Sequence, residues 1–505
     1  MCRKESVFFR VRAESNGVEL GAPAAGCYDR AGRLPRCAAG AGEYGGFGLG
    51  SVSAGIGRDQ GMIDQQDLRR LVSVRFPLFG PNKQQEIRRL VFEIVKREAM
   101  PLAAVLMAVP VGCQAYPAVK DHLVARRFPV ASAGGRISES FPALDSDPST
   151  AMPLTRAAKV PSPLRVYVEA GAESSPVVRR AREKFPSAEM IRIPGYKEYA
   201  ASKAVAGMAY NRRTEELVIL RGQHGRIRHC PCSPGVVPCG YHNIDLGVGC
   251  PFECSYCFLQ SYTNAPGIVI PASLDGAFDA FRHFGKNIRV GSGETTDSLV
   301  FDDLTCFSGA VVDFFRGYPD SVFEFKTKSA NVAGLLEVKA SSNIVVGWSL
   351  NPQVVIDQEE HFSASLAERL DAARRCAAHG YRVAFHFDPV IFRPGWEGVY
   401  ASVVQDIFKH VPSESIAWIS LGTLRMTALQ KKTIENRFPV NTILDAELLT
   451  AEDGKLRYTA EVRRDIYVRM IALLREKTAV ATHLYLCMET VPMWNLVREV
   501  VHGQY

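Results

Sequence analysis

Three cysteines lie close together in the sequence, and their spacing is typical of a metal cofactor site. Cys250, Cys254 and Cys257 form a C-x3-C-x2-C pattern within residues 249–260. Three thiolates on one short loop can hold three irons of a [4Fe–4S] cluster and leave the fourth iron open for a substrate or a cofactor. The spacing therefore predicts an iron–sulfur site with one open coordination position.

A zinc site is the alternative interpretation of the same loop. Structural zinc takes four Cys or His ligands, and Cys232, Cys239 or His242 is available as the fourth. The loop directly follows a predicted strand at the mouth of a predicted parallel barrel, where cofactor chemistry occurs, and Phe258 follows the third cysteine. This position favours the cluster over zinc.

The remaining cysteines argue against a disulfide framework. The chain has 13 cysteines, an odd number in a long sequence, and six of them fall between residues 230 and 257. Cys230, Cys232 and Cys239 allow two interpretations. They form an auxiliary metal site with His229 or His242, or they belong to a proline-stiffened loop beside the cluster.

The elements that position these cysteines follow an alternating pattern. Apolar runs that indicate strands recur with helical segments between them; the strands are predicted at 244–248, 288–291, 322–327, 344–350, 382–390 and 416–421. The clearest helix spans 363–379 and ends at Gly380. Six strand-plus-helix units imply a parallel sheet, curled as a full or partial barrel, with its chemistry at the carboxyl ends of the strands.

The rest of the chain divides by composition and periodicity. Residues 1–75 are predicted to be a disordered extension, because their first sixty residues are rich in Gly and Ala and show no sustained period. Residues 76–160 hold an amphipathic helix over 82–100 and a linker, without an assigned function. A strand at 164–169, a helix at 176–185 and a strand at 190–193 predict a small α/β unit over 161–232. The barrel is expected over 233–430 and a C-terminal helical region that closes it over 431–505.

Charge and hydropathy exclude several classes of protein. Lys and Arg number 60 and Asp and Glu 53, and residues 161–505 carry 38 of each, so the excess of 7 lies in the first 160 residues. Nucleic-acid binding by the larger part therefore needs a local basic groove. No apolar run is long enough to span a membrane, and the first residues lack the apolar core of a secretory signal. We expect a cytoplasmic protein without a membrane partner.

From about residue 164 to the C-terminus, the sequence resembles the radical S-adenosylmethionine superfamily and, within it, the spore photoproduct lyase family of DNA repair enzymes. The resembling segments are Val166 to Glu169, Tyr256 to Gln260, Phe325 to Lys328, Trp348 to Asn351 and Gly395 to Glu397. The resemblance implies an α/β fold with a partial (β/α)6 radical-SAM barrel, a small N-terminal α/β unit and a poorly structured N-terminal extension.

The resemblance also implies the cofactors. Cys250, Cys254 and Cys257 bind a [4Fe–4S] cluster, and S-adenosylmethionine binds its fourth iron and is cleaved reductively to a 5′-deoxyadenosyl radical. This radical abstracts hydrogen from a substrate, for which a thymine photoproduct in DNA is the candidate. The electron comes from a donor such as flavodoxin or ferredoxin.

Three further places are assigned to the cofactor by the resemblance, and Asp388 is a candidate from its position. Gly291, Gly293 and Glu294 resemble the Gly-Gly-Glu element that receives the methionine amino group, although a plain turn is the alternative. Lys328 and Ser349 end the third and fourth strands, where the family places contacts to the carboxylate and the ribose. Asp388 ends the fifth strand, and it either orients the ribose or substrate or ties down a barrel loop.

The substrate residues match the family only in part. The family returns a hydrogen atom from a cysteine near the second strand, assisted by tyrosines that flank the third cluster cysteine. Tyr256 matches one tyrosine, but Phe258 replaces the other, residues 287–292 contain no cysteine, and Cys306 is predicted to be a core thiol within a helix. Arg457 and Tyr458 match a DNA-contacting pair or form part of a solvated helix.

Two other functions remain open at this stage. One is a radical enzyme with a substrate other than DNA, such as a peptide or a small metabolite. The other is a non-catalytic iron–sulfur or zinc protein that binds nucleic acid.

Overall fold

The computed structural model describes residues 65–129 and 162–502, apart from short gaps at 113, 207–209, 223–225, 264, 286, 439–440 and 479–481. The chain divides into two compact units, residues 1–143 and residues 144–505. The predicted linker lies largely outside the described residues. So does the extension up to residue 64.

The described residues of the first unit, 65–129, form the helices α1 (Gln65–Arg75), α2 (Pro81–Glu98), α3 (Leu102–Met107) and α4 (Tyr116–Arg127). The helix predicted over 82–100 is confirmed as α2, whose apolar stripe is buried. Within this unit, buried Glu93 pairs with both Arg89 and Arg127 at 2.8 Å. Residues 65–75 form a helix, so the prediction of disorder is wrong for this segment.

A small parallel sheet opens the second unit. Its strands are β1 (Arg165–Glu169), β2 (Glu189–Ile193), β3 (Glu216–Leu220) and β7 (Ile268–Pro271), in the order β2-β1-β3-β7. Its helices are α6 (Pro176–Lys184) and α7 (Tyr196–Ala206), and the 3-10 helix η1 (Tyr210–Glu215) precedes β3. Val166 packs in one apolar cluster with Val178 of α6, and Tyr167 packs in another with Tyr199 of α7. The alternating side chains of β1 therefore bury both faces of the sheet.

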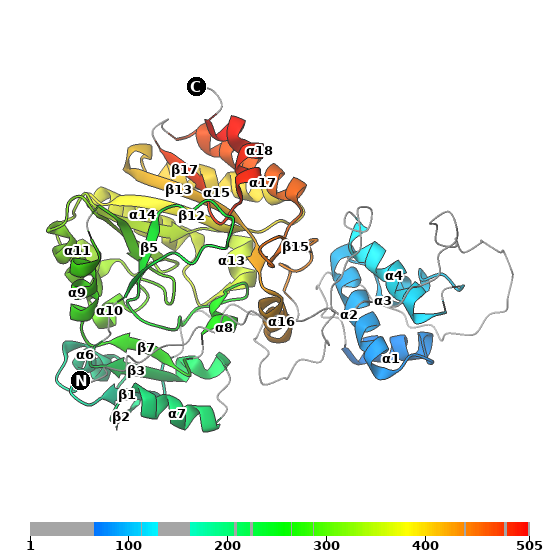
Figure 1. The fold of residues 1–505 in the computed structure, drawn as a ribbon, viewed down its shortest axis with the longest axis horizontal. Coiled ribbons are helices and arrows are strands. Elements are labelled where there is room, and N and C mark those ends of the chain that lie inside the picture. Colours follow the sequence, from blue (N-terminus) through cyan, green and yellow to red (C-terminus); the bar gives the residue numbers. More distant parts are fainter. Residues whose placement is uncertain are drawn as a thin grey trace, which may run out of the picture. The chain divides into compact units, whose positions relative to one another are not determined.

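The larger sheet forms the partial barrel. Its strands are β4 (Ile227–His229), β5 (Tyr241–Ile244), β8 (Arg289–Ser292), β9 (Val322–Thr327), β10 (Ile344–Ser349), β12 (Arg382–Val390), β13 (Ile416–Thr423) and β17 (His483–Leu486). They lie in the order β17-β13-β12-β10-β9-β8-β5-β4, and every neighbouring pair is parallel except β4 with β5. Figure 1 shows these strands as a curved sheet with helices along its outer side.

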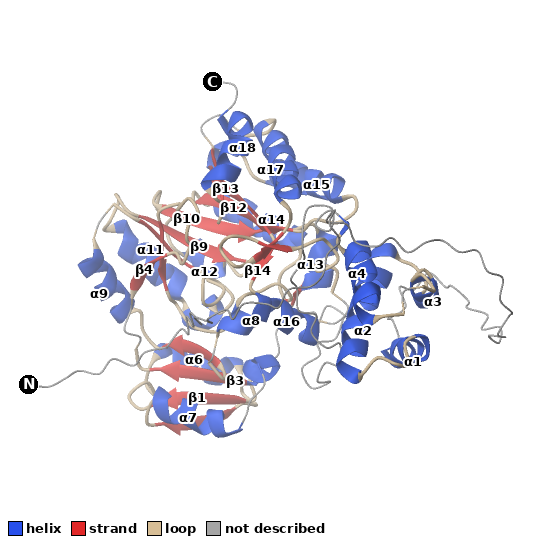
Figure 2. Cartoon of the chain, turned by 45° about the vertical axis from the view of Figure 1, so that its right-hand side comes forward, coloured by secondary structure: helices blue, strands red, loops and turns tan. Residues whose placement is uncertain are grey.

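Helices and strands alternate along the chain in this unit, as the sequence colours of Figure 1 show. The longer ones are α9 (Asp275–Phe284), α11 (Phe307–Arg316), α14 (Leu366–Ala378), α15 (Trp396–His410), α16 (Ala428–Arg437), α17 (Ala460–Arg475) and α18 (Val491–His502). The short ones are α8 (Leu259–Tyr262), α10 (Asp302–Thr305), α12 (Ala333–Glu337), α13 (Gln353–Glu359) and η2 (Ser413–Ser415). Two-residue strands are β6 (Glu253–Cys254), β11 (Glu360–His361), β14 (Arg425–Met426), β15 (Leu449–Thr450) and β16 (Leu456–Arg457), and Figure 2 separates helices, strands and loops by colour.

The sequence prediction and the structure differ at three places in this unit. The first barrel strand is predicted at 244–248 but spans 241–244, because residues 245–248 already lead into the cysteine loop. The strand β7 belongs to the small sheet, although it falls within the range assigned to the barrel. The C-terminal range predicted as helical supplies β17, a seventh parallel strand beside β13.

Charged side chains form a layer inside the barrel. Glu324 accepts hydrogen bonds from Arg289 at 2.9 Å, from His386 at 2.7 Å and from the Trp418 indole at 2.9 Å. Burial alone would raise the pKa of Glu324, but Arg289 and His386 outweigh it and hold this pKa well below its ordinary value. These buried charged side chains are thus paired with one another inside the barrel.

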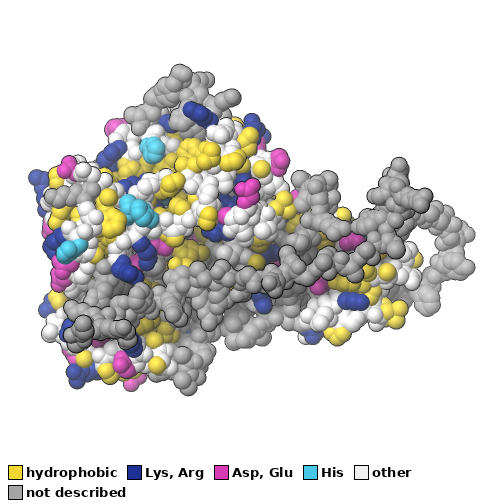
Figure 3. All heavy atoms as spheres, in the orientation of Figure 1, with side chains coloured by type: hydrophobic (Ala, Val, Ile, Leu, Met, Phe, Trp, Pro, Cys, Tyr) yellow, Lys and Arg dark blue, Asp and Glu magenta, His cyan; other side chains and the backbone are white. Residues whose placement is uncertain are grey.

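On the face shown in Figure 3, basic and acidic side chains are interspersed over the described surface.

Candidate active site

The cysteine loop leaves the carboxyl end of β5 and ends at α8. Cys250, Cys254 and Cys257 are all free thiols; Cys254 is buried and the other two are partly buried. Gly249 has a φ of 88°, and a Cβ there would lie 3.3 Å from the Cα of Ile268, so glycine is required where the loop turns. Cys254 lies close enough to Cys250 and Cys257 for both thiols to raise its pKa. The loop thus brings the three predicted ligands together.

Two buried arginines hold the loop, one of them through its backbone. Arg213 donates to the carbonyl oxygens of Cys250 at 3.0 Å and of Phe252 at 2.9 Å, and it also pairs with Glu253. Arg437 pairs with the other carboxylate oxygen of Glu253 at 2.8 Å. These bonds fix the loop on a rigid support, as the precise positioning of cofactor ligands requires.

The three thiols suit a cluster in which each thiolate binds a different iron. Among the described residues, no three His, Cys, Asp or Glu side chains converge on a single metal ion. Three thiolates of a [4Fe–4S] cluster bind three different irons, so they need not converge in this way. Burial raises the pKa of each thiol, that of Cys250 to about 12, and binding of a metal would have to displace the protons.

The fourth ligands considered for zinc have other neighbours. The imidazole Nδ1 of His242 lies 3.4 Å from the carbonyl oxygen of Arg289, and its ring centroid lies 4.4 Å from that of His229. The neighbours that affect the pKa of Cys232 are Cys230, Cys239, Cys487 and Arg425, none of which belongs to the cluster loop. The contacts given for His242 and Cys232 are thus with residues outside the cluster loop.

Tyr256 belongs to a buried polar network behind the cluster loop. Its hydroxyl donates to Glu360 and accepts from the Asn351 amide at 3.3 Å. Glu360 also accepts from Asn351 at 2.8 Å and pairs with Arg369 at 2.6 Å. Burial and the adjacent Glu360 carboxylate raise the pKa of Tyr256 well above its ordinary value. The phenol therefore keeps its proton.

Lys328 lies beside this network. Its ammonium is 5.7 Å from the centre of the Tyr256 ring. Burial disfavours the charged form of Lys328, but the neighbouring Cys254 and Glu360 outweigh it and raise the pKa of the ammonium. Ser349 is partly buried at the end of β10, and its carbonyl oxygen accepts from Arg369 at 2.9 Å. Lys328 thus lies beside Tyr256 of the loop, and Ser349 is joined through Arg369 to Glu360, which binds Tyr256.

The Gly-Ser-Gly-Glu segment, residues 291–294, spans the carboxyl end of β8. Gly293 has a φ of 104°, and a Cβ there would lie 2.8 Å from the backbone oxygen of Lys326. A Cβ at Gly291 would collide with the Tyr241 hydroxyl, so this glycine makes room for a side chain. Glu294 is 9% exposed, one carboxylate oxygen pairs with Arg228 at 3.1 Å, and the other is buried without a partner. Burial raises the pKa of Glu294 despite Arg228.

Asp388 forms a two-pronged ion pair with Arg425, at 2.7 and 3.0 Å. Burial would raise the pKa of Asp388, but Arg425 lowers it, so the carboxylate is charged. This pairing favours the structural alternative, in which Asp388 fixes a barrel loop.

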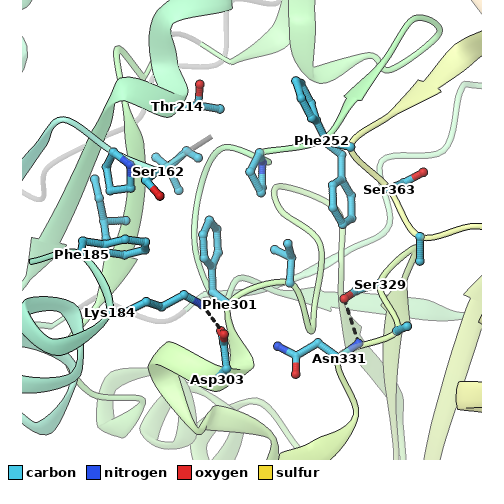
Figure 4. A pocket seen from close by; sticks show the side chains of 18 of the residues that line it. Ser162, Lys184, Phe185, Thr214, Phe252, Phe301, Asp303, Ser329, Asn331 and Ser363 are labelled. Atoms are coloured by element: carbon cyan, nitrogen blue, oxygen red, sulfur yellow. Dashed lines mark hydrogen bonds and ion pairs between the residues drawn. The ribbon is translucent and has the colours of Figure 1, made fainter. Parts of the chain in front are cut away.

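A cavity of about 860 Å³ lies next to the cysteine loop (Figure 4). Its lining includes Pro251 and Phe252 but none of the three cysteines. Lys184 of α6 and Asp303 of α10 form an ion pair at its edge. The cavity therefore lies between the small sheet and the barrel, away from Glu294.

A sequence model of the spore photoproduct lyase family matches residues 163–470. The chain belongs to this family. It is therefore a radical S-adenosylmethionine enzyme of the lyase-like kind, and the non-catalytic alternative is set aside.

Spore photoproduct lyases are also found among similar proteins. That of Geobacillus sp. (strain Y412MC61) is 25% identical over 295 residues, which are 56% of this chain and 85% of that enzyme. That of Bacillus subtilis (strain 168) is 26% identical over 219 residues, which are 42% of this chain and 64% of that enzyme.

Solved structures of spore photoproduct lyase share the fold. The complex with dinucleoside spore photoproduct has a TM-score of 0.55 at 22% identity and covers 66% of this chain and all of that one. A mutant with bound AdoMet and dinucleoside spore photoproduct has a TM-score of 0.54 at 23% identity and the same coverage. The predicted α/β barrel is thereby confirmed.

The Arg–Tyr pair predicted for the lyase's DNA contact is buried. Arg457 lies on the strand β16, is 3% exposed, pairs with Asp453 at 2.7 Å and donates to the Met488 carbonyl oxygen at 3.0 Å. Tyr458 is 1% exposed, and its hydroxyl accepts from the Phe392 amide at 3.1 Å. The alternative of a solvated helix is wrong, and the contacts of both residues are structural.

Cys306 is also placed differently from the prediction. It is exposed, with a φ of 55°, at the junction between α10 and α11. Its side chain is therefore not a core thiol.

Sequence reasoning missed several supporting residues of the site. Glu360 is one of them, although the run Glu359-Glu360-His361 after the fourth strand was a signal. Arg213 and Arg437 carry no local pattern, because each acts through contacts with residues 37 or more positions away.

No helix among the described residues is long and apolar enough to cross a membrane.

Proposed function

We propose that this enzyme uses a [4Fe–4S] cluster and S-adenosylmethionine to act on a thymine photoproduct in DNA. Cys250, Cys254 and Cys257 would hold the cluster. When bound, the reduced cluster and S-adenosylmethionine supply a 5′-deoxyadenosyl radical, which abstracts hydrogen from the substrate. A flavodoxin or ferredoxin would provide the electron.

The observation that carries the proposal is the pairing of two features at one end of the barrel. Three free thiols lie on the loop after β5, and Glu294 lies at the end of the adjacent parallel strand β8 with a buried carboxylate oxygen that has no partner. A buried, unpaired carboxylate oxygen is costly unless a ligand completes it. A methionine ammonium would do so.

The other residues of the chain orient ligands and hold protons. Lys328, kept charged beside the loop, would bind the carboxylate of S-adenosylmethionine, and the Ser349 hydroxyl would contact the ribose. Gly291 and Gly293 let the chain pass closely between Tyr241 and Lys326, so that Glu294 reaches the site. Asp388 would act on the ribose or substrate only through the loop that it anchors to Arg425. Tyr256 would assist in hydrogen return while Glu360 orients its hydroxyl.

DNA is supported as the substrate by the names of the similar proteins, whose structures hold dinucleoside spore photoproduct. A substrate other than DNA is the second candidate. It is favoured by the burial of Arg457 and Tyr458 and by the interspersed charges on the described part of the face in Figure 3, because a duplex is usually bound by a basic groove.

The experiment compares two substrates. The reconstituted and reduced protein is mixed with S-adenosylmethionine and with duplex DNA that either contains or lacks the spore photoproduct, and 5′-deoxyadenosine and restored thymine are measured. We expect the lesion to stimulate 5′-deoxyadenosine formation and to be converted to thymines. Cleavage at the same rate without the lesion, with no repair, would favour the second candidate.

A further inference from the structure

A second set of four cysteines lies apart from the cluster loop. Cys230, Cys232 and Cys239 lie in the segment between β4 and β5, and Cys487 directly follows β17. All four are free thiols, and the proposed function uses none of them. Three come from one short segment, and the fourth comes from the far end of the chain.

The fold brings these distant segments together. The strands β17 and β4 lie at opposite ends of the eight-stranded sheet. Even so, the amide of Val237 donates to the carbonyl oxygen of Glu489 at 2.9 Å, and Val236 forms an antiparallel bridge with Thr490. The segment after β4 therefore crosses from one edge of the half-barrel to the other. Cys487 is fixed in turn by its amide, which donates to Leu421 at 2.7 Å.

The four side chains are neighbours at this crossing. The thiols of Cys230 and Cys232 lie close enough for each to change the pKa of the other. Cys239 and Cys487 lie close enough to Cys232 to affect its pKa. Cys239 affects the pKa of Cys487 in the same way. Two strand ends and one loop thus place four sulfur atoms in one region.

Three cations lie beside these thiols. The neighbouring Cys232 and burial raise the pKa of Cys230, and burial and Asp388 raise that of Cys487, so a metal would have to displace the protons. A guanidinium nitrogen of Arg425 lies 4.0 Å from the sulfur of Cys487. Lys326 lies within electrostatic range of Cys230, and Lys455 lies within range of Cys232. Cations at these positions stabilise the negative charge of a tetrathiolate centre. Asp388 raises the pKa of Cys487, so Arg425 and the metal would have to offset this carboxylate when the proton leaves.

The ligand segment is stiff. Pro231, Pro234 and Pro238 alternate with its cysteines, and each fixes its own φ. The amide of Cys232 donates to the carbonyl oxygen of Cys230 at 2.7 Å, and the amide of Cys230 donates to Tyr241 at 2.9 Å. A stiff segment loses little conformational entropy when its side chains bind a ligand.

We propose that Cys230, Cys232, Cys239 and Cys487 bind a second metal centre through four thiolates and that this centre fastens the two edges of the half-barrel to each other. Four thiolates suit zinc or an iron–sulfur cluster. All four ligands come from the protein, so this centre has no open position for S-adenosylmethionine. In the metal-free chain, no three of the described ligand-type side chains converge on one ion. Binding of one zinc ion would therefore require Cys239 and Cys487 to move toward Cys230 and Cys232. An iron–sulfur cluster binds each thiolate at a different iron, so it can bridge sulfur atoms that lie farther apart.

The test isolates the second centre. The full chain carrying C250A, C254A and C257A is purified without oxygen, and zinc, iron and acid-labile sulfide are measured per chain. We expect one zinc ion or one iron–sulfur cluster to remain, and the two contents distinguish the two metals. Adding Cys239→Ser and Cys487→Ser should lower that metal content by about tenfold or more. Adding Cys306→Ala and Cys376→Ala, an exposed and a buried thiol elsewhere, should leave it unchanged.

A reciprocal variant covers the case in which the first one does not fold. Cys230, Cys232, Cys239 and Cys487 are all replaced by serine in the otherwise native chain, and circular dichroism checks the fold. We expect this protein to hold one centre fewer than the native protein. Equal metal content in the two folded proteins would overturn the proposal, as would a folded C250A/C254A/C257A variant that takes up neither zinc nor iron and sulfide. The proposal does not depend on activity, so a failure to cleave S-adenosylmethionine would leave it standing.

Discussion

The hydroxyl of Tyr256 donates a hydrogen bond to the carboxylate of Glu360, a residue 104 positions later in the chain. Glu360 also forms the β-bridge partner of Cys254 and the ion-pair partner of Arg369. Glu360 thus meets Cys254 through its backbone, and its carboxylate connects Tyr256 to the helix α14. Its chemistry can be tested separately from the cofactor.

Replacing Glu360 by glutamine should destabilise the protein. The substitution leaves the buried guanidinium of Arg369 without a counter-charge, and breaking such a pair costs about 3 kcal/mol or more. Urea unfolding of the metal-free protein measures this. Asp371→Asn is the matched control, because it removes a half-exposed ion pair with Arg374 on the same helix and should cost less than about 1 kcal/mol. Equal effects of the two substitutions would contradict the prediction.

The same carboxylate predicts a pH dependence. Burial raises the pKa of Glu360, but Arg369 and Lys328 outweigh it and lower the pKa from 4.5 to about 2. A depressed pKa stabilises the folded state above the ordinary value and loses this contribution as the pH falls toward 2. The difference in unfolding free energy between the native protein and Glu360→Gln should therefore shrink as the pH falls below 4.5. A difference that stays constant or grows in that range would rule out this origin.

Arg213 should be needed to hold the cysteine loop. Arg213→Met removes the donors to Cys250 and Phe252 and one of the two cations beside Glu253. We expect a loss of about 3 kcal/mol in stability and a lower iron content after reconstitution. The adjacent Arg212 is the control, because it is exposed and pairs only locally with Glu215. If Arg212→Met lowered the iron content as much, the specific role of Arg213 would be wrong.

Glu294 should set the affinity for S-adenosylmethionine. Glu294→Gln replaces a charged acceptor for an ammonium by a neutral one, which weakens binding by about 1.5 to 3 kcal/mol, or roughly ten- to hundredfold. Equilibrium binding to the cluster-loaded protein measures this. Asp245→Asn is the control, since Asp245 pairs with the same Arg228 but is not predicted to meet the cofactor. An unchanged affinity in Glu294→Gln would remove this residue from the site.

The barrel could be predicted from the sequence because local patterns encode it. The strands β9 and β12 have the predicted bounds, since their closely spaced β-branched and aromatic residues leave a clear local trace. The strand β17 could not be predicted, because its four residues pair only with β13, some sixty residues earlier. Its place at the sheet edge is a property of the tertiary fold.

The cofactor loop was visible in the sequence, whereas its support was not. Cysteine spacing identifies Cys250, Cys254 and Cys257, because three ligands on one loop are local in sequence. The contacts of Arg213, Glu360 and Arg437 join positions far apart in the chain. Arg457 was misjudged for the same reason, since only the fold shows that Asp453 and the Met488 carbonyl oxygen enclose its charge.

The formation of 5′-deoxyadenosine tests the central assignment most directly. The native protein and Cys254→Ala are each reconstituted with iron and sulfide, reduced and mixed with S-adenosylmethionine, and the product is quantified; Cys376→Ala, a buried thiol on α14, is the control. We expect the native protein and the control to form 5′-deoxyadenosine and Cys254→Ala to form none. An active Cys254→Ala protein with an intact cluster, or an inactive native protein with a full cluster, would contradict the assignment of the cysteine loop.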